Sequence, residues 1–467
     1  MTAALPASVT ATSSMLGMLA HHACSISYDR MPQRARAQTI LCIADTVACM
    51  ASGSTTIEAG NVIAAELARA SGGPVTVVGQ AGGFAMDAAA RINAYMGDVH
   101  ELNDLICGHA SIGSVSAALA VAQARGSTGR ELIEAVAAGI ETTSRIYSMF
   151  YPTMKPYVDV GIVCVGPVNT MGAAVAAARL LKLDEAQTLQ AMANAGAQAG
   201  WCPAEVIFGD GGSVKPLLFG GLPAAAGISG ALYAMHGVTG PSRLLESNMG
   251  YLATAAKSHD PRPAADTETW YVESPRRKLH ACCGYIHSAL DTVVALRHAG
   301  LDFADVQSIE VAVPEYIVAA ITKPGPPRTP NEARFHLQYC LAVAADGQDV
   351  IVPQHSDQFA TFLQKPLVDR LMPRIDVRGD ARFKHYHESE TTVVSRSGQK
   401  LAVKFNGAPK GSPQNELSDT EVWEKFARLT STYERQLQAV DYRGRLAKLE
   451  GERETSWILR SFAPATP

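Results

Sequence analysis

The chain has 467 residues, of which 47% are hydrophobic and 18% are charged, and its formal net charge is −4. This composition excludes an intrinsically disordered protein, because enough apolar residues are present to build a sizeable core. The slightly acidic balance argues against nucleic acid or an anionic membrane as a partner, since both call for a concentrated basic surface. The length predicts two or three domains.

The N-terminal residues and the cysteines bear on location. No Lys or Arg precedes Arg30, so the N-terminus lacks the basic flank of a signal peptide. No segment of transmembrane length is free of polar groups. Nine scattered cysteines are typical of free thiols in a reducing compartment. We therefore expect a cytoplasmic protein that does not bind membranes.

Helices rich in alanine and other small residues are predicted up to about residue 270. Residues 131–150 keep apolar side chains at helical spacing, and Thr128 begins a capping box before them. Residues 169–183 and 185–200 are typical of an antiparallel helix pair, with Asp184 as the N-cap of the second helix. So many small residues allow helix backbones to approach closely, which favours a tightly packed bundle.

The pattern changes after the stretch DPRPAADTETW, residues 260–270. The segments whose apolar residues alternate as in strands are 306–316, 390–396 and 399–405. Helical patterns at residues 287–300 and 332–347 lie among these strands, which predicts a compact α+β domain.

Helical character returns after residue 407 and continues to the C-terminus, with Ser418 and Glu421 as another capping box. We therefore predict a mainly α protein. A large all-helical bundle domain would be built from both chain ends, residues 1–272 and 408–467. A smaller α+β domain, residues 273–407, would be inserted between them as a lid or substrate domain.

Residues 93–115 gather titratable side chains between two apolar helices. They are Asp98, His100, Glu101, Asp104 and His109. Asp104 and His109 are separated by the short turn-forming stretch LICG, which could bring both to one pocket wall. A histidine beside a carboxylate is the usual general base, because the carboxylate fixes the tautomer and stabilises the imidazolium. The alternative is a polar loop that caps the next helix, with Ser111 as N-cap.

A second cluster, RRKLHACCGYIHSALD, spans residues 276–291. It contains Arg276, Arg277, Lys278, His280, Cys282, Cys283, Tyr285 and His287. Adjacent cysteines chelate one ion poorly and no CxxC pair is present, so we expect no metal site. The residue types favour an anion-binding edge at the mouth of the second domain. Alternatively, Arg276 and Arg277 solvate a domain junction.

Lys215 is the only Lys or Arg between Lys182 and Arg243, in a stretch that is otherwise apolar or glycine. Three interpretations are open. The lysine could extend to the surface. It could form a Schiff base, with a pKa lowered by apolar surroundings. It could also stay protonated and hold a substrate carboxylate or a developing enolate oxygen where water is excluded.

Taken together, five stretches in order resemble the MmgE/PrpD family along nearly the whole chain. They are residues 44–53, 126–146, 214–241, 278–291 and 409–426. The second is similar to the family segment G-x-x-G-x-x-L-x-x-A-x-x-x-G-x-E, and the last to its PKG-x-P-x-N-x-L motif. The resemblance implies an all-helical large domain, an inserted α+β domain and an active site between them, in a homodimer. It also implies chemistry without metal or organic cofactor.

The resemblance also implies site residues. Asp104, His109, Lys215 and His287 match catalytic positions of the family, with Lys215 expected to point into the pocket as a permanent cation. The residues expected to contact substrate are His100, Tyr157, Cys164, Lys278, His280, Cys283 and Tyr285. Three departures stand out: the Asp104–His109 loop is short, Cys164 replaces a family histidine, and Asp98 stands where the family has its first histidine.

The leading hypothesis is a cofactor-independent lyase, a dehydratase or decarboxylase, that acts on a small polycarboxylate. His109 would be the base, Asp104 its partner or an acid, and Lys215 with Lys278 or His287 would hold the anion. The alternatives are an epimerase or isomerase of a di- or polycarboxylate, which needs two bases, a Schiff-base enzyme, and a non-catalytic organic-anion binder. Which polycarboxylate is used does not follow from the pattern.

Overall fold

The computed structural model describes residues 14–69, 72–209 and 211–464, and it is predominantly helical with one small sheet. This confirms the mainly α class. The helices of the first part are α1 (Met15–Ser25), α2 (Gln33–Gly53), α3 (Ile57–Arg69), α4 (Met86–Asp98), α5 (Ala110–Arg125), α6 (Gly129–Phe150), α7 (Tyr157–Val160), α8 (Val165–Leu180), α9 (Glu185–Ala197), α10 (Glu205–Phe208), α11 (Leu222–Met235), α12 (Tyr251–Ala255) and α13 (Arg262–Ala265). The C-terminal helices are α21 (Asp419–Leu429), α22 (Glu434–Ala439), α23 (Tyr442–Leu446) and α24 (Trp457–Arg460).

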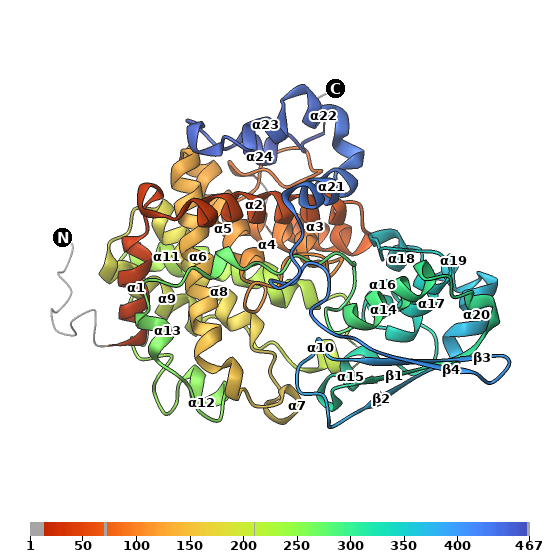
Figure 1. Cartoon of the computed structure of the whole chain (residues 1–467). Coiled ribbons are helices and arrows are strands. Elements are labelled where there is room, and N and C mark those ends of the chain that lie inside the picture. Colours follow the sequence, from red (N-terminus) through yellow and green to blue (C-terminus); the bar gives the residue numbers. More distant parts are fainter. Residues whose placement is uncertain (1–13, 70–71, 210, 465–467) are drawn as a thin grey trace.

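In the sequence, a mixed α and β region separates these two sets of helices. It lies at the right of Figure 1. Its elements are α14 (His287–His298), β1 (Val306–Val313), α15 (Val318–Ile321), α16 (Pro330–Arg334), α17 (Leu337–Ala345), α18 (Pro353–Asp357), α19 (Phe359–Leu363), α20 (Pro366–Leu371), β2 (Ile375–Gly379), β3 (Glu390–Ser395) and β4 (Lys400–Lys404). The strand order is β2-β1-β3-β4. β1 pairs in parallel with β2 and antiparallel with β3, so that Ile309 lies between Ile375 and Val393.

The predicted helix starts are confirmed at three places. The capping boxes at Thr128, Asp184 and Ser418 all form, each with the reciprocal pair of hydrogen bonds. Ser111 is not an N-cap: α5 begins one residue after His109, whose side chain makes no capping bond. The helix expected at 332–347 is broken between α16 and α17, because His336 adopts an extended conformation and caps α17.

The buried apolar side chains form two main clusters, which separate the helical part from the mixed part. The first draws on residues 15–281 and 426–462, so both chain ends contribute to one core. The second draws on residues 282–393 and lies between the sheet and helices such as α14, α17 and α20. The domain limits expected from the sequence, residues 1–272 with 408–467 and residues 273–407, stay a prediction.

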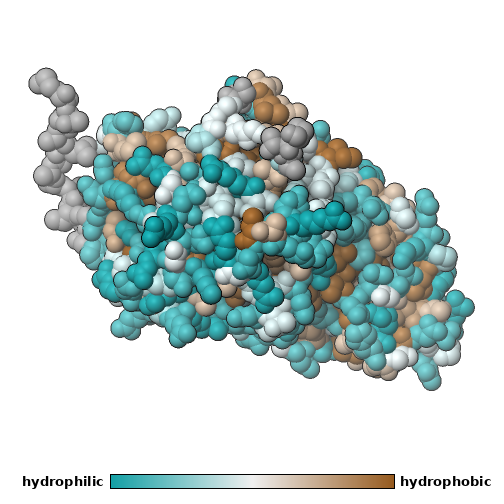
Figure 2. All heavy atoms as spheres, turned by 90° about the horizontal axis from the view of Figure 1, so that it is seen from above, coloured by the Kyte–Doolittle hydropathy of each residue, from teal (hydrophilic) through white to brown (hydrophobic). Residues whose placement is uncertain are grey.

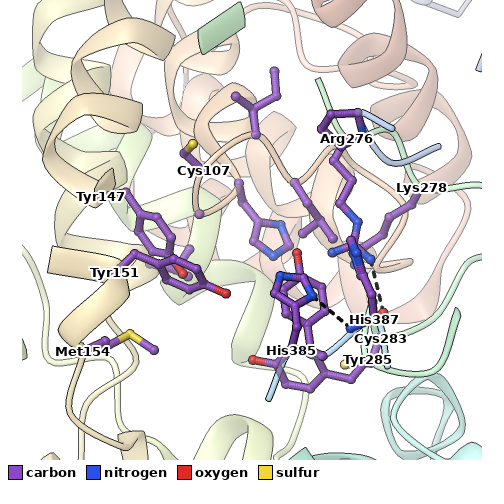
Figure 3. A pocket seen from close by; sticks show the side chains of 18 of the residues that line it. Cys107, Tyr147, Tyr151, Met154, Arg276, Lys278, Cys283, Tyr285, His385 and His387 are labelled. Atoms are coloured by element: carbon purple, nitrogen blue, oxygen red, sulfur yellow. Dashed lines mark hydrogen bonds between the residues drawn. The ribbon is translucent and has the colours of Figure 1, made fainter. Parts of the chain in front are cut away.

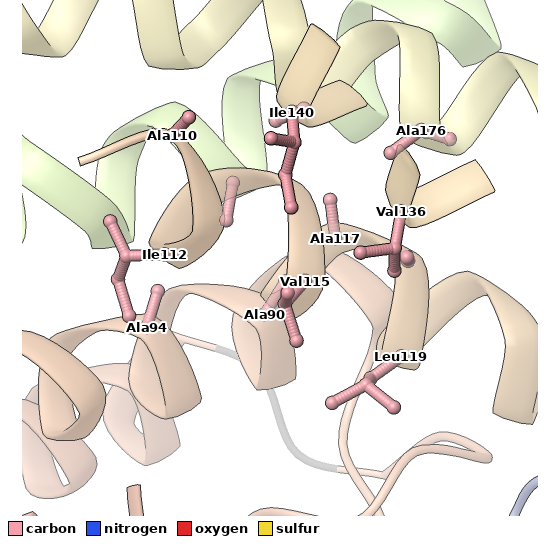
Figure 4. Close-up of a cluster of buried hydrophobic side chains, with 14 of the residues drawn as sticks. Ala90, Ala94, Ala110, Ile112, Val115, Ala117, Leu119, Val136, Ile140 and Ala176 are labelled. Atoms are coloured by element: carbon pink, nitrogen blue, oxygen red, sulfur yellow. The ribbon is translucent and has the colours of Figure 1, made fainter. Parts of the chain in front are cut away.

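The helical core is built from small side chains. Figure 4 shows Ala90, Ala94, Ala117 and Ala176 beside Val136 and other branched residues in this layer. α8 packs against α5, α6, α9 and α11. Where α6 crosses α8, a Cβ on Gly172 would overlap the hydroxyl of Thr143 and approach the carbonyl of Gly139. The absence of a side chain at Gly172 therefore sets the distance between these two helices.

One continuous helical stretch, Leu217–Met235, is long and apolar enough to cross a membrane, but 61% of it is buried inside the protein. A core helix of a soluble protein has the same properties. On the face seen in Figure 2, hydrophilic residues cover most of the surface and hydrophobic ones occur in small groups. The cytoplasmic location stays a prediction.

The helix crossing yields a first testable prediction. Gly172→Ala is expected to lower the free energy of unfolding by about 1–3 kcal/mol, because the added methyl group overpacks the crossing. Gly60→Ala is the matched control, since a Cβ there meets nothing within 4 Å. It is expected to raise stability by about 0.4–1 kcal/mol. Urea unfolding measures both, and an equal effect of the two substitutions would contradict the packing argument.

Candidate active site

A cavity of about 880 Å³ lies between the helical part and the mixed part. The helical part contributes residues 101–109, the end of α6 and the segment that follows it. The mixed part contributes residues 276–285 and 385–388, and residues 407–414 close another side. Figure 3 shows Arg276 and Lys278 on one side of this cavity and Tyr147 and Tyr151 on the other. A site of this kind, between two structural units, is a common place for a ligand.

The loop that follows α4 forms the floor of the cavity. Glu101, Cys107 and His109 have positive φ angles of 53°, 27° and 63°, which fold the loop tightly. Such angles are uncommon outside glycine and mark a backbone held by its surroundings. Two bonds hold it here: the Leu105 amide donates to the Arg276 carbonyl (2.6 Å), and Lys425 Nζ of α21 donates to the Leu102 carbonyl (2.8 Å).

Two buried lysines share the carboxylate of Glu101. Lys278 Nζ lies 2.5 Å from Glu101 Oε2, and Lys215 Nζ contacts Glu101 Oε1. Lys215 Nζ also lies 2.8 Å from Asp98 Oδ2, at the end of α4, and 4.2 Å from the centre of the Phe219 ring. Phe219 is placed there by the π-helical turn η4 (Leu217–Gly221) that precedes α11. Two ammonium groups therefore face two carboxylates in a space almost closed to solvent.

Burial decides the protonation behaviour of this cluster. Desolvation lowers the pKa of Lys215 and of Lys278 to about 8, despite the nearby carboxylates. Desolvation likewise raises the pKa of Asp98. Each shift favours the neutral form of the group, as expected when charges leave water. The lysines are therefore mostly cations at neutral pH, but they lose their protons about 2.5 pH units below the usual lysine pKa of 10.5.

Arg276 is a positively charged residue of the cavity wall. It has no carboxylate partner among the residues that the structure describes. It is 5% exposed, donates to the Gly284 carbonyl at 3.3 Å, and its guanidinium lies 4.7 Å from the centre of the Tyr386 ring. A buried unpaired cation is costly. The side chain therefore offers a binding position for an anion, and a guanidinium can hold a carboxylate by two parallel hydrogen bonds.

His109, the residue directly before α5, lines the cavity. Its Nδ1 lies 4.0 Å from Asp98 Oδ1, and neither atom has a hydrogen-bond partner among the described residues. Its ring meets Phe219 edge-on, with centroids 5.6 Å apart. Burial, and then the charges of Lys278 and Arg276, hold the pKa of His109 well below its usual value. The imidazole is therefore neutral at pH 7 and able to accept a proton.

The structure brings five of the predicted site residues to the cavity wall and leaves six outside it. Those that line the cavity are Tyr157, His109, Lys278, Cys283 and Tyr285. Lys215 does not line it but lies one layer behind, against Glu101. The expectation that Lys215 points into the pocket is therefore not met. The other residues outside the wall are His100, Asp104, Cys164, His280 and His287.

Asp104 and His109 do not share a wall of the pocket, contrary to expectation. Asp104 Oδ2 accepts a hydrogen bond from Ser111 Oγ, and Oδ1 accepts one from the Ile106 amide at 3.4 Å. Burial raises the pKa of Asp104 to about 6. The carboxylate therefore ties the loop to the first turn of α5, and the tight left-handed turns of the loop place His109 alone in the cavity.

His280 and His287 face the interior of the mixed part. His280 Nδ1 accepts a hydrogen bond from the Ile351 amide at 3.2 Å, so Nε2 carries the proton and donates to Asp291 Oδ1 at 3.1 Å. His287 Nε2 lies 3.3 Å from the Cys282 carbonyl, and its ring meets that of His280 edge-on. These contacts position the start of α14, which begins at His287.

His100 and Cys164 also lie away from the cavity. The His100 ring lies between Ser52 Oγ (3.2 Å) and Asp357 Oδ2 (3.0 Å), beside a second cavity of about 490 Å³ that Asp357 lines. Cys164 is buried just before α8, its carbonyl accepts from the Tyr251 hydroxyl at 2.8 Å, and burial raises the pKa of its thiol to about 11. Neither side chain is placed to touch a ligand in the 880 Å³ cavity.

Several cavity residues were not selected from the sequence. They are Glu101, Arg276, Tyr147, Tyr151, His385 and His387. The dense acidic cluster and the Arg-Arg-Lys run included the first two, but their spacing does not reveal which side chain points inward. The run His-Tyr-His at 385–387 is an available signal, because it places two imidazoles, which can transfer protons near neutral pH, beside an aromatic ring. Among the described residues, no group of three or more His, Cys, Asp or Glu could hold a metal ion.

Comparisons with known proteins agree along most of the chain. The MmgE/PrpD N-terminal domain model matches residues 17–264, and the MmgE/PrpD C-terminal domain model matches residues 280–442. Cis-aconitate decarboxylase of Aspergillus terreus (strain NIH 2624 / FGSC A1156) is 25% identical over 422 residues, which cover 85% of this chain and 83% of the relative. A second cis-aconitate decarboxylase of Aspergillus terreus is 25% identical over 384 residues, 77% of either chain.

The lysine pKa values give a prediction for anion binding. Succinate, a dicarboxylate that is ionised above neutral pH, is expected to bind more weakly as the pH rises through about 8, because Lys278 loses its proton. The dissociation constant should rise by up to about tenfold per pH unit beyond that point. Calorimetry between about pH 7 and about pH 9.5 measures this. Lys278→Arg should move the loss to higher pH, and a constant affinity over the range would contradict the assignment.

Proposed function

The chain belongs to the MmgE/PrpD family, and we propose that it is a cofactor-independent lyase, a dehydratase or decarboxylase, acting on a small polycarboxylate. The family and the two cis-aconitate decarboxylases support an enzyme of this general type. The family membership does not specify the substrate or the bond that is broken, so both are part of our proposal. Assembly as a homodimer also stays a prediction.

The observation that carries the proposal is a neutral, unpaired imidazole beside two buried cations. His109 lines the cavity together with Arg276 and Lys278, and their positive charge helps to keep the imidazole neutral. Loss of a proton or of CO2 next to a carboxylate leaves negative charge on oxygen or carbon. Fixed cations stabilise such charge strongly, because their positions are already set and they need no reorganisation during the reaction.

The proposed reaction starts with one substrate carboxylate on Arg276 and another near Lys278. In dehydration, His109 takes the proton from the carbon next to a carboxylate, and the electron pair moves towards that carboxylate. The pair then forms the double bond as hydroxide leaves, and the leaving oxygen takes a proton from a neutral cavity phenol such as that of Tyr285. In decarboxylation, CO2 leaves, its bonding electrons remain on carbon, and that carbon takes a proton from water or from a neutral cavity phenol, which water then reprotonates.

Glu101 and Lys215 act on this chemistry through Lys278. Glu101 is held by both lysines, so it fixes the position of the Lys278 ammonium at the cavity wall. Lys215 supplies a second positive charge, which offsets the desolvation cost of burying the Glu101 carboxylate. We therefore assign Glu101 and Lys215 to positioning, and His109, Arg276 and Lys278 to contact with the substrate.

An epimerase is the second candidate, and it requires a base on each face of the substrate carbon. His387 provides the observation in its favour: it lines the cavity, and its Nε2 is buried without a hydrogen-bond partner among the described residues. Burial lowers the pKa of His387 to about 3, so this imidazole too is neutral at pH 7. A non-catalytic organic-anion binder would use the same cations and leave its ligand unchanged.

Proton NMR in deuterium oxide separates these candidates. We expect the purified protein to introduce deuterium, with a new alkene or loss of CO2, in at least one member of a panel of citrate, 2-methylcitrate, cis-aconitate, tartrate, malate and iminodisuccinate. Deuterium without an alkene or loss of CO2 would instead favour the epimerase. Tight binding with no change in any ligand would favour the binder and contradict the lyase.

Two histidine variants test the assignment of the base. His109→Gln is expected to lower turnover or exchange by about 10²–10⁴-fold, because the imidazole takes the proton, while substrate still binds. His287→Gln is the matched control, since it is equally buried but outside the cavity. It should keep turnover within a few fold, with any effect seen in the melting temperature instead. Equal losses of kcat in both variants would contradict the assignment.

A further inference from the structure

The cavity has two chemically different ends. In Figure 3, Arg276 and Lys278 lie on one side and Tyr147, Tyr151 and Met154 on the other. The volume of about 880 Å³ is near the top of the range of roughly 300–1,000 Å³ for pockets that bury drug-sized ligands. A citrate-sized acid on the cations would leave most of this space to water. The second end is therefore either an open entrance or a part of the binding site.

The second end is a wall of tyrosines built by the end of α6 and the turns after it. Tyr147 stacks on Tyr151 with ring centroids 5.0 Å apart, and Tyr157 meets Phe208 edge-on at 6.1 Å. None of the described cavity residues between positions 147 and 165 is charged. Burial raises the pKa of Tyr147 and of Tyr157, so both phenols stay neutral. This wall offers flat apolar surface and no counter-charge for an anion.

The charges of the first end set a limit on what it can neutralise. Lys215 and Lys278 face Asp98 and Glu101, so these four groups compensate one another. Among the described residues, Arg276 and Lys278 are the two Lys or Arg side chains that line the cavity, and of these Arg276 has no carboxylate partner. A ligand with three carboxylates would place at least one of them on neutral groups or on the aromatic wall. That placement is unfavourable when water is excluded.

We infer that the natural substrate is a carboxylic acid that carries an apolar substituent, aromatic or of similar bulk, which packs against the tyrosine wall while its carboxylates bind at Arg276 and Lys278. The inference rests on the proposed function for the polar end and adds the class of substrate. A flat ring is the best complement, because offset and edge-on ring contacts add to the gain from removing apolar surface from water.

Three dicarboxylic and tricarboxylic acids test this on the full chain by calorimetry at pH 7. Succinate carries no substituent, 2-benzylsuccinate carries a phenyl group, and tricarballylate carries a third carboxylate in the corresponding position. The inference predicts that 2-benzylsuccinate binds at least tenfold more tightly than succinate, equivalent to about 1.4 kcal/mol. It predicts that tricarballylate binds no better than succinate. Tighter binding of tricarballylate than of 2-benzylsuccinate would overturn it.

Two tyrosine variants locate the effect. Tyr151→Ala is expected to reduce the preference for 2-benzylsuccinate over succinate about fivefold, because it removes part of the wall. Tyr233→Ala is the matched control: Tyr233 is similarly exposed but lies on α11, outside the cavity. It should leave the preference unchanged. An unchanged preference in Tyr151→Ala, or the same loss in both variants, would also overturn the inference.

A third variant separates failure of the inference from failure of the proposed function. Arg276→Gln is expected to weaken both succinate and 2-benzylsuccinate by tenfold or more. If Arg276→Gln weakens both acids but the wild-type protein binds the two acids equally, the proposed carboxylate site is supported and the inference about the apolar substituent is wrong. If neither acid binds wild type, or if Arg276→Gln changes nothing in a folded protein, both the inference and the proposed site are wrong.

Discussion

The candidate site depends on one carboxylate shared by two buried ammonium groups. Glu101 lies between Lys215, which precedes α11 in the helical part, and Lys278, which leads into the mixed part. Removing one member of such a cluster leaves an uncompensated buried charge, which costs about 3–5 kcal/mol. The cluster therefore couples the two parts of the molecule at the cavity floor. It also sets the path of the loop that presents His109.

Much of the fold could be predicted from local patterns. The capping boxes at Thr128, Asp184 and Ser418 mark helix starts because their hydrogen bonds are formed within a few residues. The alternation around Val306–Val313 and Glu390–Ser395 marks strands because successive side chains of a strand point to opposite faces of a sheet. A local sequence pattern predicts the wrong secondary structure where contacts with other segments determine the backbone conformation. His336, which interrupts a good helical pattern, is one such place, because its Nε2 lies 2.8 Å from the Gly325 carbonyl.

The sequence predicts which types of residue form the site, but not which of their side chains point into the cavity. The clusters around residues 98–109 and 276–287 do meet at one cavity. Within them, the Asp104–His109 spacing favours Asp104 and the family resemblance implies His287, whereas Glu101 and Arg276 line the wall. Three left-handed residues in the first loop reverse which side chains point inward, and such angles depend on tertiary contacts rather than on the sequence nearby. Lys215 stands out in the sequence as a solitary cation and is buried in the structure, but its partners, Asp98 and Glu101, lie more than 100 residues away.

The bond from Lys425 to the Leu102 carbonyl joins residues 323 positions apart, and Lys425 also forms an ion pair with Asp45 at 2.7 Å. During synthesis on the ribosome, α2 and the loop that follows α4 emerge long before α21 exists. The N-terminal helices can pack early, yet the loop below His109 lacks its tether until the last part of the chain has been made. Completion of the candidate site is therefore a late event in the biogenesis of this protein, and an incomplete chain lacks that tether.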